Sequence, residues 1–107
     1  MERIEKAQEI AVWAVTPRGA ELALTLVHAL PNADLYLSSA SIPNRGAPAI
    51  YFDRLSAVLS EAFHRYRGHV FIMSTGIVVR MIAPLLRHKT EDPAVVVMNE
   101  TGRDRKS

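Results

Sequence analysis

The sequence contains no cysteine, and this absence excludes both a disulfide framework and chemistry at a thiolate. A cysteine-free chain suits a reducing compartment, so we expect a cytoplasmic protein. No apolar run approaches the roughly 20 residues that a membrane-spanning helix needs, and no membrane partner is expected. The first residues, MERIEKAQE, are polar and carry charges of both signs, unlike a secretory signal.

Several chemical fingerprints are also missing. The net charge is only +2, with lysine and arginine spread along the chain, so no nucleic-acid partner is expected. The nucleotide-binding motifs G-x-G-x-x-G and G-x-x-x-x-G-K do not occur, and neither does the G-x-S-x-G elbow of a serine hydrolase. The four histidines lack the i, i+4 spacing of a helical metal site. We therefore expect no metal site and interpret most of the histidines as surface residues.

What the sequence does contain is an alternation of apolar runs and amphipathic segments. One domain is expected over residues 1–107, with 1–8 and 104–107 as loose ends. Strands are predicted at Glu9–Val15, Ala33–Leu37, Val70–Met73 and Ala94–Met98. Helices are predicted at 17–30, 54–66 and 77–86, the first capped by Thr16 and the second by Asp53, with Pro84 bending or restarting the third.

The segment Ser38–Tyr51 has two prolines and no hydrophobic period, so it is predicted to be a loop of about a dozen residues. A loop of this length is often functional or mobile. Together with Tyr51 and Phe52, the part Ser38–Ala49 could cover a large flat ligand. A surface loop with an aromatic anchor is the favoured interpretation.

The alternation of strands and helices favours the α/β class: an open three-layer α/β/α domain with a mainly parallel, four-stranded sheet. We expect the four strands in the spatial order 2-1-3-4. In that order the direction of winding reverses between the first and third strands. Ligands of such folds bind in the crevice outside the carboxyl ends of the strands at this reversal.

Two short turns, Thr16–Gly19 and Ser74–Gly76, are predicted to meet at the reversal. Each offers a threonine, a glycine and a helix N-terminus, whose free N–H groups attract carboxylates and phosphates. The sequence therefore predicts an anion-binding crevice there. Simple helix capping is an equally good interpretation of Thr75 and Gly76. Ser74 is not a convincing nucleophile, because no His–Asp pair can be assigned to it.

The residues FIMSTGIVVRMIAPLLRHKTEDPAVVVMNETGR, with AVTPRGAELA near the start, resemble the N-terminal domain of the CbiG family. That family comprises the cobalt-precorrin-5A hydrolases of anaerobic cobalamin biosynthesis. The resemblance covers residues 9–103, with Val70–Arg103 as its specific part, and it implies an open α/β domain. It also implies opening of a lactone ring on a cobalt corrinoid, with release of acetaldehyde. Cobalt would enter as part of the substrate, so no cofactor is expected.

A cobalt-corrinoid intermediate carries many acetate and propionate groups, so the resemblance implies carboxylate receptors. The substrate-binding candidates are Thr16, Arg18, Gly19, Ser74, Thr75, Gly76 and Arg80. Arg80 is predicted one turn into its helix, where its planar guanidinium group could reach a carboxylate. A solvent-exposed Arg80 without a ligand is an equally good interpretation. No catalytic residue can be assigned from the sequence.

Family members usually continue beyond the part that resembles Glu100–Arg103 into a further strand, a Gly/His-rich stretch and more domains. No such stretch is present here, so we expect a domain that contributes part of the substrate cleft. Its partners would be the remaining domains of the enzyme or a companion chain. The alternative is a non-catalytic corrinoid-binding or assembly module, which pairs with another chain or with its own copy through the edge of the last strand.

Overall fold

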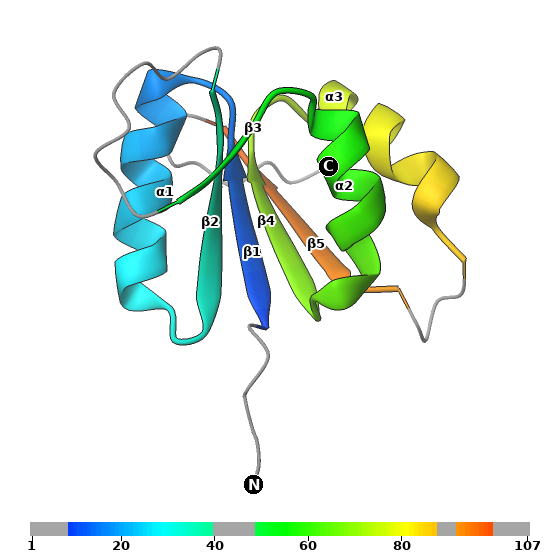
Figure 1. Cartoon of the computed structure of the whole chain (residues 1–107), viewed down its shortest axis with the longest axis horizontal. Helices are drawn as coiled ribbons and strands as arrows, with labels where there is room; N and C mark the ends of the chain where they lie inside the picture. The colour runs from blue at the N-terminus through cyan, green and yellow to red at the C-terminus, as the bar shows by residue number, and fades with distance from the viewer. Residues whose placement is uncertain (1–8, 40–48, 88–91, 100–107) are drawn as a thin grey trace, which may run out of the picture.

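The computed structural model describes residues 9–39, 49–87 and 92–99 (Figure 1). Its strands are β1 (Ile10–Ala14), β2 (Ala33–Ser38), β3 (Ile50–Phe52), β4 (Gly68–Ile72) and β5 (Ala94–Met98). Its helices are α1 (Pro17–Ala29), α2 (Leu55–Ala62) and α3 (Thr75–Ile82). Single 3₁₀ turns follow the last two helices at Phe63–Arg65 and Ala83–Leu85.

The five strands form one parallel sheet in the order β3-β2-β1-β4-β5. This confirms the α/β class and the order 2-1-3-4 of the four predicted strands, which are β2, β1, β4 and β5. The reversal of winding therefore lies between β1 and β4, as expected. The paired residues Ala14 and Ile72 stand near the carboxyl ends of these two strands.

The expected count of four strands has to be corrected to five. The additional strand, β3, overlaps the end of the predicted loop and pairs with β2, with Tyr36 opposite Ile50 and Ser38 opposite Phe52. A segment of three residues is too short to show the alternating hydrophobic pattern of a strand. The strand forms because its backbone pairs with β2. Residues 40–48 of the predicted loop lie outside the described residues.

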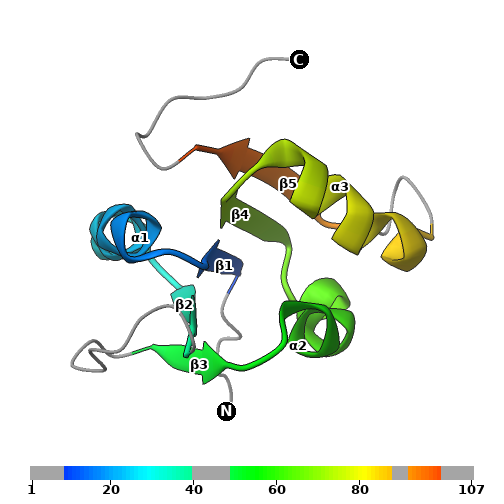
Figure 2. The ribbon, with the colours of Figure 1, turned by 90° about the horizontal axis from the view of Figure 1, so that it is seen from above.

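The sheet is the middle of three layers, with α1 on one face and α2 and α3 on the other (Figure 2). Alternate residues along each strand supply the two cores. The α1 side buries Val12, Ala14, Ala20, Ala23, Leu35, Leu37 and Ile72. The opposite side buries Ala11, Trp13, Tyr36, Phe52, Leu59, Ala62, Phe63, Phe71, Met73 and Val78.

The predicted helix start is confirmed for α1 and has to be corrected for α2. The α1 helix begins as expected, with Thr16 as its N-cap and Pro17 at the first helical position. The α2 helix, however, has Arg54 at its N-cap and no side-chain cap bond. The carboxylate of Asp53 instead accepts a hydrogen bond of 2.5 Å from the Ser39 hydroxyl, which joins the ends of β2 and β3.

A buried stack of rings lies under α2, centred on Trp13, which is fully buried. Its indole stacks on Tyr36 at 4.1 Å between ring centroids, and its N–H donates a 2.9 Å hydrogen bond to Nδ1 of His69. Because an indole N–H can only donate, the proton of His69 must lie on Nε2, which donates to the Phe63 carbonyl at 2.8 Å. His69 is therefore a neutral core residue, unlike the surface histidines that the sequence favoured.

The buried His69 predicts a loss of stability in mild acid. Burial lowers the pKa of the His69 imidazole below its usual value, an effect that the hydrogen bond to Phe63 only partly offsets. The unfolded chain therefore binds a proton before the folded one, and stability falls as pH drops through about 6.5, the ordinary histidine pKa. We expect stability to fall between pH 6.5 and 5.5, by at most about 1 kcal/mol, measured by urea unfolding.

The control for this measurement keeps His69 as the single histidine. A variant carrying His28→Gln, His64→Gln and His88→Gln should still lose stability between pH 6.5 and 5.5, because burial, the main cause of the lowered His69 pKa, is unchanged. A triple variant whose stability no longer depends on pH in this range would show that His69 is not responsible.

Candidate functional site

The two predicted corners lie side by side at the carboxyl end of the sheet. Because β1 and β4 are hydrogen-bonded neighbours, the turns that follow Ala14 and Ile72 leave the sheet at the same edge (Figure 1). The turn after β1 enters α1 and the turn after β4 enters α3. The geometry of the two helix starts, however, is different.

The corner that begins α1 satisfies most of its own backbone groups. The Thr16 hydroxyl accepts the Gly19 N–H at 3.0 Å, and the Thr16 carbonyl accepts the Ala20 N–H at 2.8 Å. Pro17 has no N–H to offer. Gly19 is buried, and a Cβ at this position would lie 3.4 Å from the Ile72 carbonyl oxygen. This glycine therefore allows α1 to approach β4, and it is not positioned to receive a ligand.

Gly19→Ala is expected to lower the free energy of unfolding by about 1–2 kcal/mol. The new Cβ would lie 3.0 Å from the Thr16 hydroxyl oxygen and 3.4 Å from Cγ2 of Ile72, so it would disturb the cap and crowd β4. The control is Gly76→Ala, because no atom lies within 4 Å of the corresponding position there. Chemical denaturation that ranks the two variants in the opposite order would contradict this packing role.

The corner that begins α3 is open. Ser74 occupies the N-cap without a side-chain hydrogen bond, and the Val78 N–H is the first in the helix to bond, to the Ser74 carbonyl at 3.3 Å. Within the described parts of the chain, the N–H groups of Thr75, Gly76 and Ile77 have no acceptor. The side chains of this turn are exposed, so these three donors face solvent at the positive end of the helix.

A hollow of about 340 Å³ opens at the α3 corner. It is lined by Met73, Ser74, Thr75, Gly76 and Asn99. The structure thus brings Ser74, Thr75 and Gly76 together, and adds Asn99 from the end of β5. Asn99 is not among the site residues predicted from the sequence. Its position directly after a parallel strand was the available signal, because such strand ends meet at one edge.

The other predicted residues do not line this hollow. Thr16 and Gly19 bond to each other in the neighbouring corner, and the side chain of Arg18 is exposed on the first turn of α1. Arg80 is exposed on α3, five residues after Thr75. Neither arginine is placed at the three open amides.

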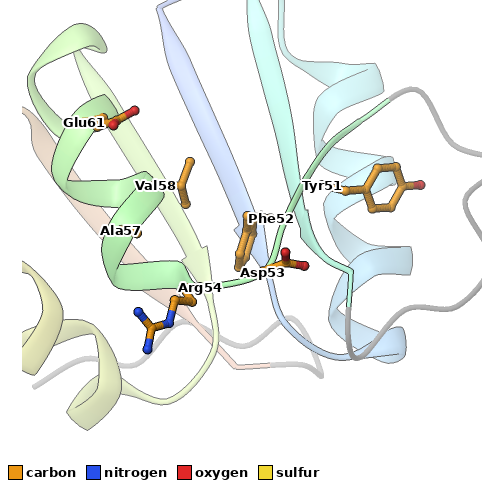
Figure 3. Close-up of a pocket in the computed structure, with 7 residues that line it drawn as sticks. All are labelled: Tyr51, Phe52, Asp53, Arg54, Ala57, Val58 and Glu61. Carbon is orange, nitrogen blue, oxygen red and sulfur yellow. The ribbon is translucent and has the colours of Figure 1, made fainter.

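A second hollow of about 360 Å³ lies between β3 and α2 (Figure 3). It is lined by Tyr51, Phe52, Asp53, Arg54, Ala57, Val58 and Glu61. Phe52 is buried in the core and Tyr51 points away from α2, so neither ring is extended over it as a cover. The lining carries two carboxylates, Asp53 and Glu61, against one guanidinium, Arg54, so its net negative charge disfavours a ligand rich in carboxylates and makes the α3 corner the better candidate.

Within the described ranges 9–39, 49–87 and 92–99, no group of three or more histidine, cysteine or acidic residues could hold a metal ion. No helix within the same ranges has the length and apolar character to cross a membrane.

Comparison with known proteins points to one family. Residues 57–104 match the family described as cobalamin synthesis G N-terminal. A protein named cobalt-precorrin-5A hydrolase from Priestia megaterium is 34% identical over 104 residues, which is 94% of this chain and 28% of that protein. A protein of the same name from Salmonella typhimurium strain LT2 is 38% identical over 99 residues, 92% of this chain and 27% of the relative.

The chain therefore spans little more than a quarter of the length of these relatives. Among solved structures, a protein described as a cobalamin biosynthesis protein G homolog from Sulfolobus solfataricus matches 88% of this chain and 26% of its own. That match has a TM-score of 0.61 at 17% identity, so it bears on the fold alone. The family match and the two relatives together identify this chain as a member of the cobalamin synthesis G N-terminal family.

Proposed function

We propose that this chain is the part of a cobalt-precorrin-5A hydrolase that holds carboxylate groups of the corrinoid substrate at the start of α3. The observation that carries the proposal is the set of three N–H groups at Thr75–Ile77 that have no acceptor among the described residues. The names of the two relatives supply the substrate class.

The open amides suit an acetate or propionate arm. A carboxylate oxygen accepts hydrogen bonds from adjacent backbone N–H groups at a helix start, and each bond to a charged group contributes about 1.5–3 kcal/mol. Gly76 leaves the approach clear because it has no side chain. The hollow of about 340 Å³ is near the small end of ligand pockets, so it fits one arm while the macrocycle lies outside.

The hydrolytic step needs groups that this hollow does not contain. In the proposed reaction a lactone ring opens and acetaldehyde is released, which requires an activated water molecule. Met73, Ser74, Thr75, Gly76 and Asn99 include no general base with a suitable pKa. We therefore assign activation of water to the remaining domains of the enzyme or to a companion chain. Cobalt is bound in the substrate itself, and the reaction takes place in the cytoplasm.

The test of this proposal is a titration of the chain with two cobalt corrinoids, followed by the absorbance of the macrocycle. One corrinoid carries its acetate and propionate groups as free acids, and the other carries them as amides. We expect the free acid to bind at least about tenfold more tightly, because the amide cannot supply the negative charge. Absence of binding, or equal binding of the two, would overturn the proposal.

A second candidate function, a non-catalytic assembly module, is favoured by a feature of β5. This strand pairs with β4 on one side, and its other edge has no strand beside it in the described part of the sheet. Free edges of this kind recruit strands of other chains. Light scattering at increasing protein concentration tests it: growth to a dimer supports edge pairing, and a constant monomer mass contradicts it.

A further inference from the structure

The last strand, β5, is apolar on both faces, but only one face is covered within the described residues. Val95 and Val97 pack against the core under α2 and α3. The alternate residues Val96 and Met98 pair with Val70 and Ile72 of β4, so they point to the α1 side. Val96 is 47% exposed there, which is unusual for a valine in a parallel sheet.

The same apolar surface continues onto α1. Gly19 faces Ile72 of β4, so residues three and seven positions later lie on the flank of α1 that is turned toward β4. These residues are Leu22 and Leu26, both of which are half-buried. We call the surface formed by Leu22, Leu26, Val70, Val96 and Met98 the apolar strip.

The two faces of the sheet are covered unequally. Two helices, α2 and α3, lie side by side on one face, whereas α1 stands alone on the other (Figure 2). The α1 helix packs on β1, β2 and β4. On that face, no helix of the described ranges lies over β5. Sheets made only of parallel strands are normally covered by helices on both faces.

We propose that the apolar strip is the docking surface for one amphipathic helix, supplied by the part of the longer protein that this chain does not match in its relatives. The helix would lie beside α1 over β4 and β5, at the usual interaxial distance of about 8–10 Å. Apolar residues at positions i, i+3, i+4 and i+7 would face the strip. This inference rests on family membership and is independent of the carboxylate site.

Two observations favour this occupant. The residues after β5, NETGRDRKS, include no aliphatic or aromatic side chain, so they cannot supply an apolar stripe. The relatives, in contrast, have nearly three quarters of their length outside the matched segment. A second copy of this chain is the competing occupant, and the experiment below separates the two.

The absence of cysteine allows a direct test by thiol labelling. Val96→Cys places a thiol in the strip, and Ile50→Cys is its matched control, because Ile50 is 44% exposed on the edge strand at the other side of the sheet. Each variant is made in this chain and in a chimaera in which this chain replaces the matching segment of the Priestia megaterium relative. Labelled sites are read by mass spectrometry.

We expect the thiol from Val96→Cys to react at least about tenfold more slowly in the chimaera than in the isolated chain. In the chimaera the docked helix would cover the thiol, so labelling would require the helix to detach locally. The thiol from Ile50→Cys should react at similar rates in both, because Ile50 lies on the edge strand away from the strip. A second variant, Leu26→Cys, should be slowed like Val96→Cys.

Equal rates for Val96→Cys in the two proteins would overturn the proposal. So would slow labelling in the isolated chain, since its own residues would then cover the strip. A labelling rate that falls as the concentration of the isolated chain rises would assign the strip to a second copy, and would also overturn the proposed occupant.

Discussion

Replacement of His69 by leucine is expected to lower the free energy of unfolding by about 2–5 kcal/mol, because it leaves two buried polar groups without partners. The indole N–H of Trp13 would lose its acceptor at 2.9 Å, and the Phe63 carbonyl would lose its donor at 2.8 Å. Leucine fills much of the ring volume, so the missing hydrogen bonds, and not a cavity, should account for the effect.

A double-mutant cycle with Trp13→Phe isolates the hydrogen bond. Phenylalanine keeps a ring in the stack but has no N–H group, so His69→Leu should cost less in that background, by about 1–3 kcal/mol. The measurement is urea unfolding of the four proteins at pH 7.5. Additive losses in the double variant would show that the Trp13–His69 hydrogen bond does not contribute, and that the stack depends on packing alone.

Ser74→Asp is expected to separate stability from ligand binding. Aspartate is a favoured N-cap, and its carboxylate can accept the open N–H groups that begin α3, so the variant should be more stable by about 1 kcal/mol. The same carboxylate occupies the donors that we assign to the substrate and repels its negative charge. Binding of the free-acid corrinoid should therefore weaken at least about tenfold, which corresponds to the loss of one bond to a charged group.

The control for Ser74→Asp is Val79→Glu, which adds a carboxylate to the same helix away from its start. Val79 is 55% exposed, so the substitution should leave both folding and corrinoid binding nearly unchanged. Thermal unfolding and absorbance titration are made on all three proteins. If Ser74→Asp binds the corrinoid as tightly as the wild type, then the α3 corner is not the receptor.

Much of the fold followed from the periodicity of the chain. Apolar strands alternating with amphipathic helices predicted the parallel sheet, its order and the neighbouring corners of β1 and β4, because these follow from general rules of α/β topology. The effect of Pro84 was also predicted: α3 ends at Ile82, and Pro84 lies in the 3₁₀ turn Ala83–Leu85.

The features that the sequence did not predict depend on contacts between distant residues. The strand β3 forms because it pairs with β2. Asp53 does not cap α2, because its carboxylate accepts a hydrogen bond from Ser39. The tautomer of His69 is fixed by the hydrogen bond from Trp13, which lies 56 positions away in the sequence. The sequence also treated the two glycine corners as equivalent. Their difference arises because Gly19 packs against Ile72, whereas nothing lies within 4 Å of the Cβ position of Gly76.

If the first amides of α3 receive a corrinoid carboxylate, their NMR signals must respond to the ligand. This can be followed in a ¹H–¹⁵N NMR titration of the ¹⁵N-labelled chain with a diamagnetic cobalt(III) corrinoid in its free-acid form. We expect the amide signals of Thr75, Gly76 and Ile77 to move first and furthest, and to stay in place with the amidated corrinoid. Shifts confined to the hollow between β3 and α2, or no shifts at these three amides, would contradict this expectation.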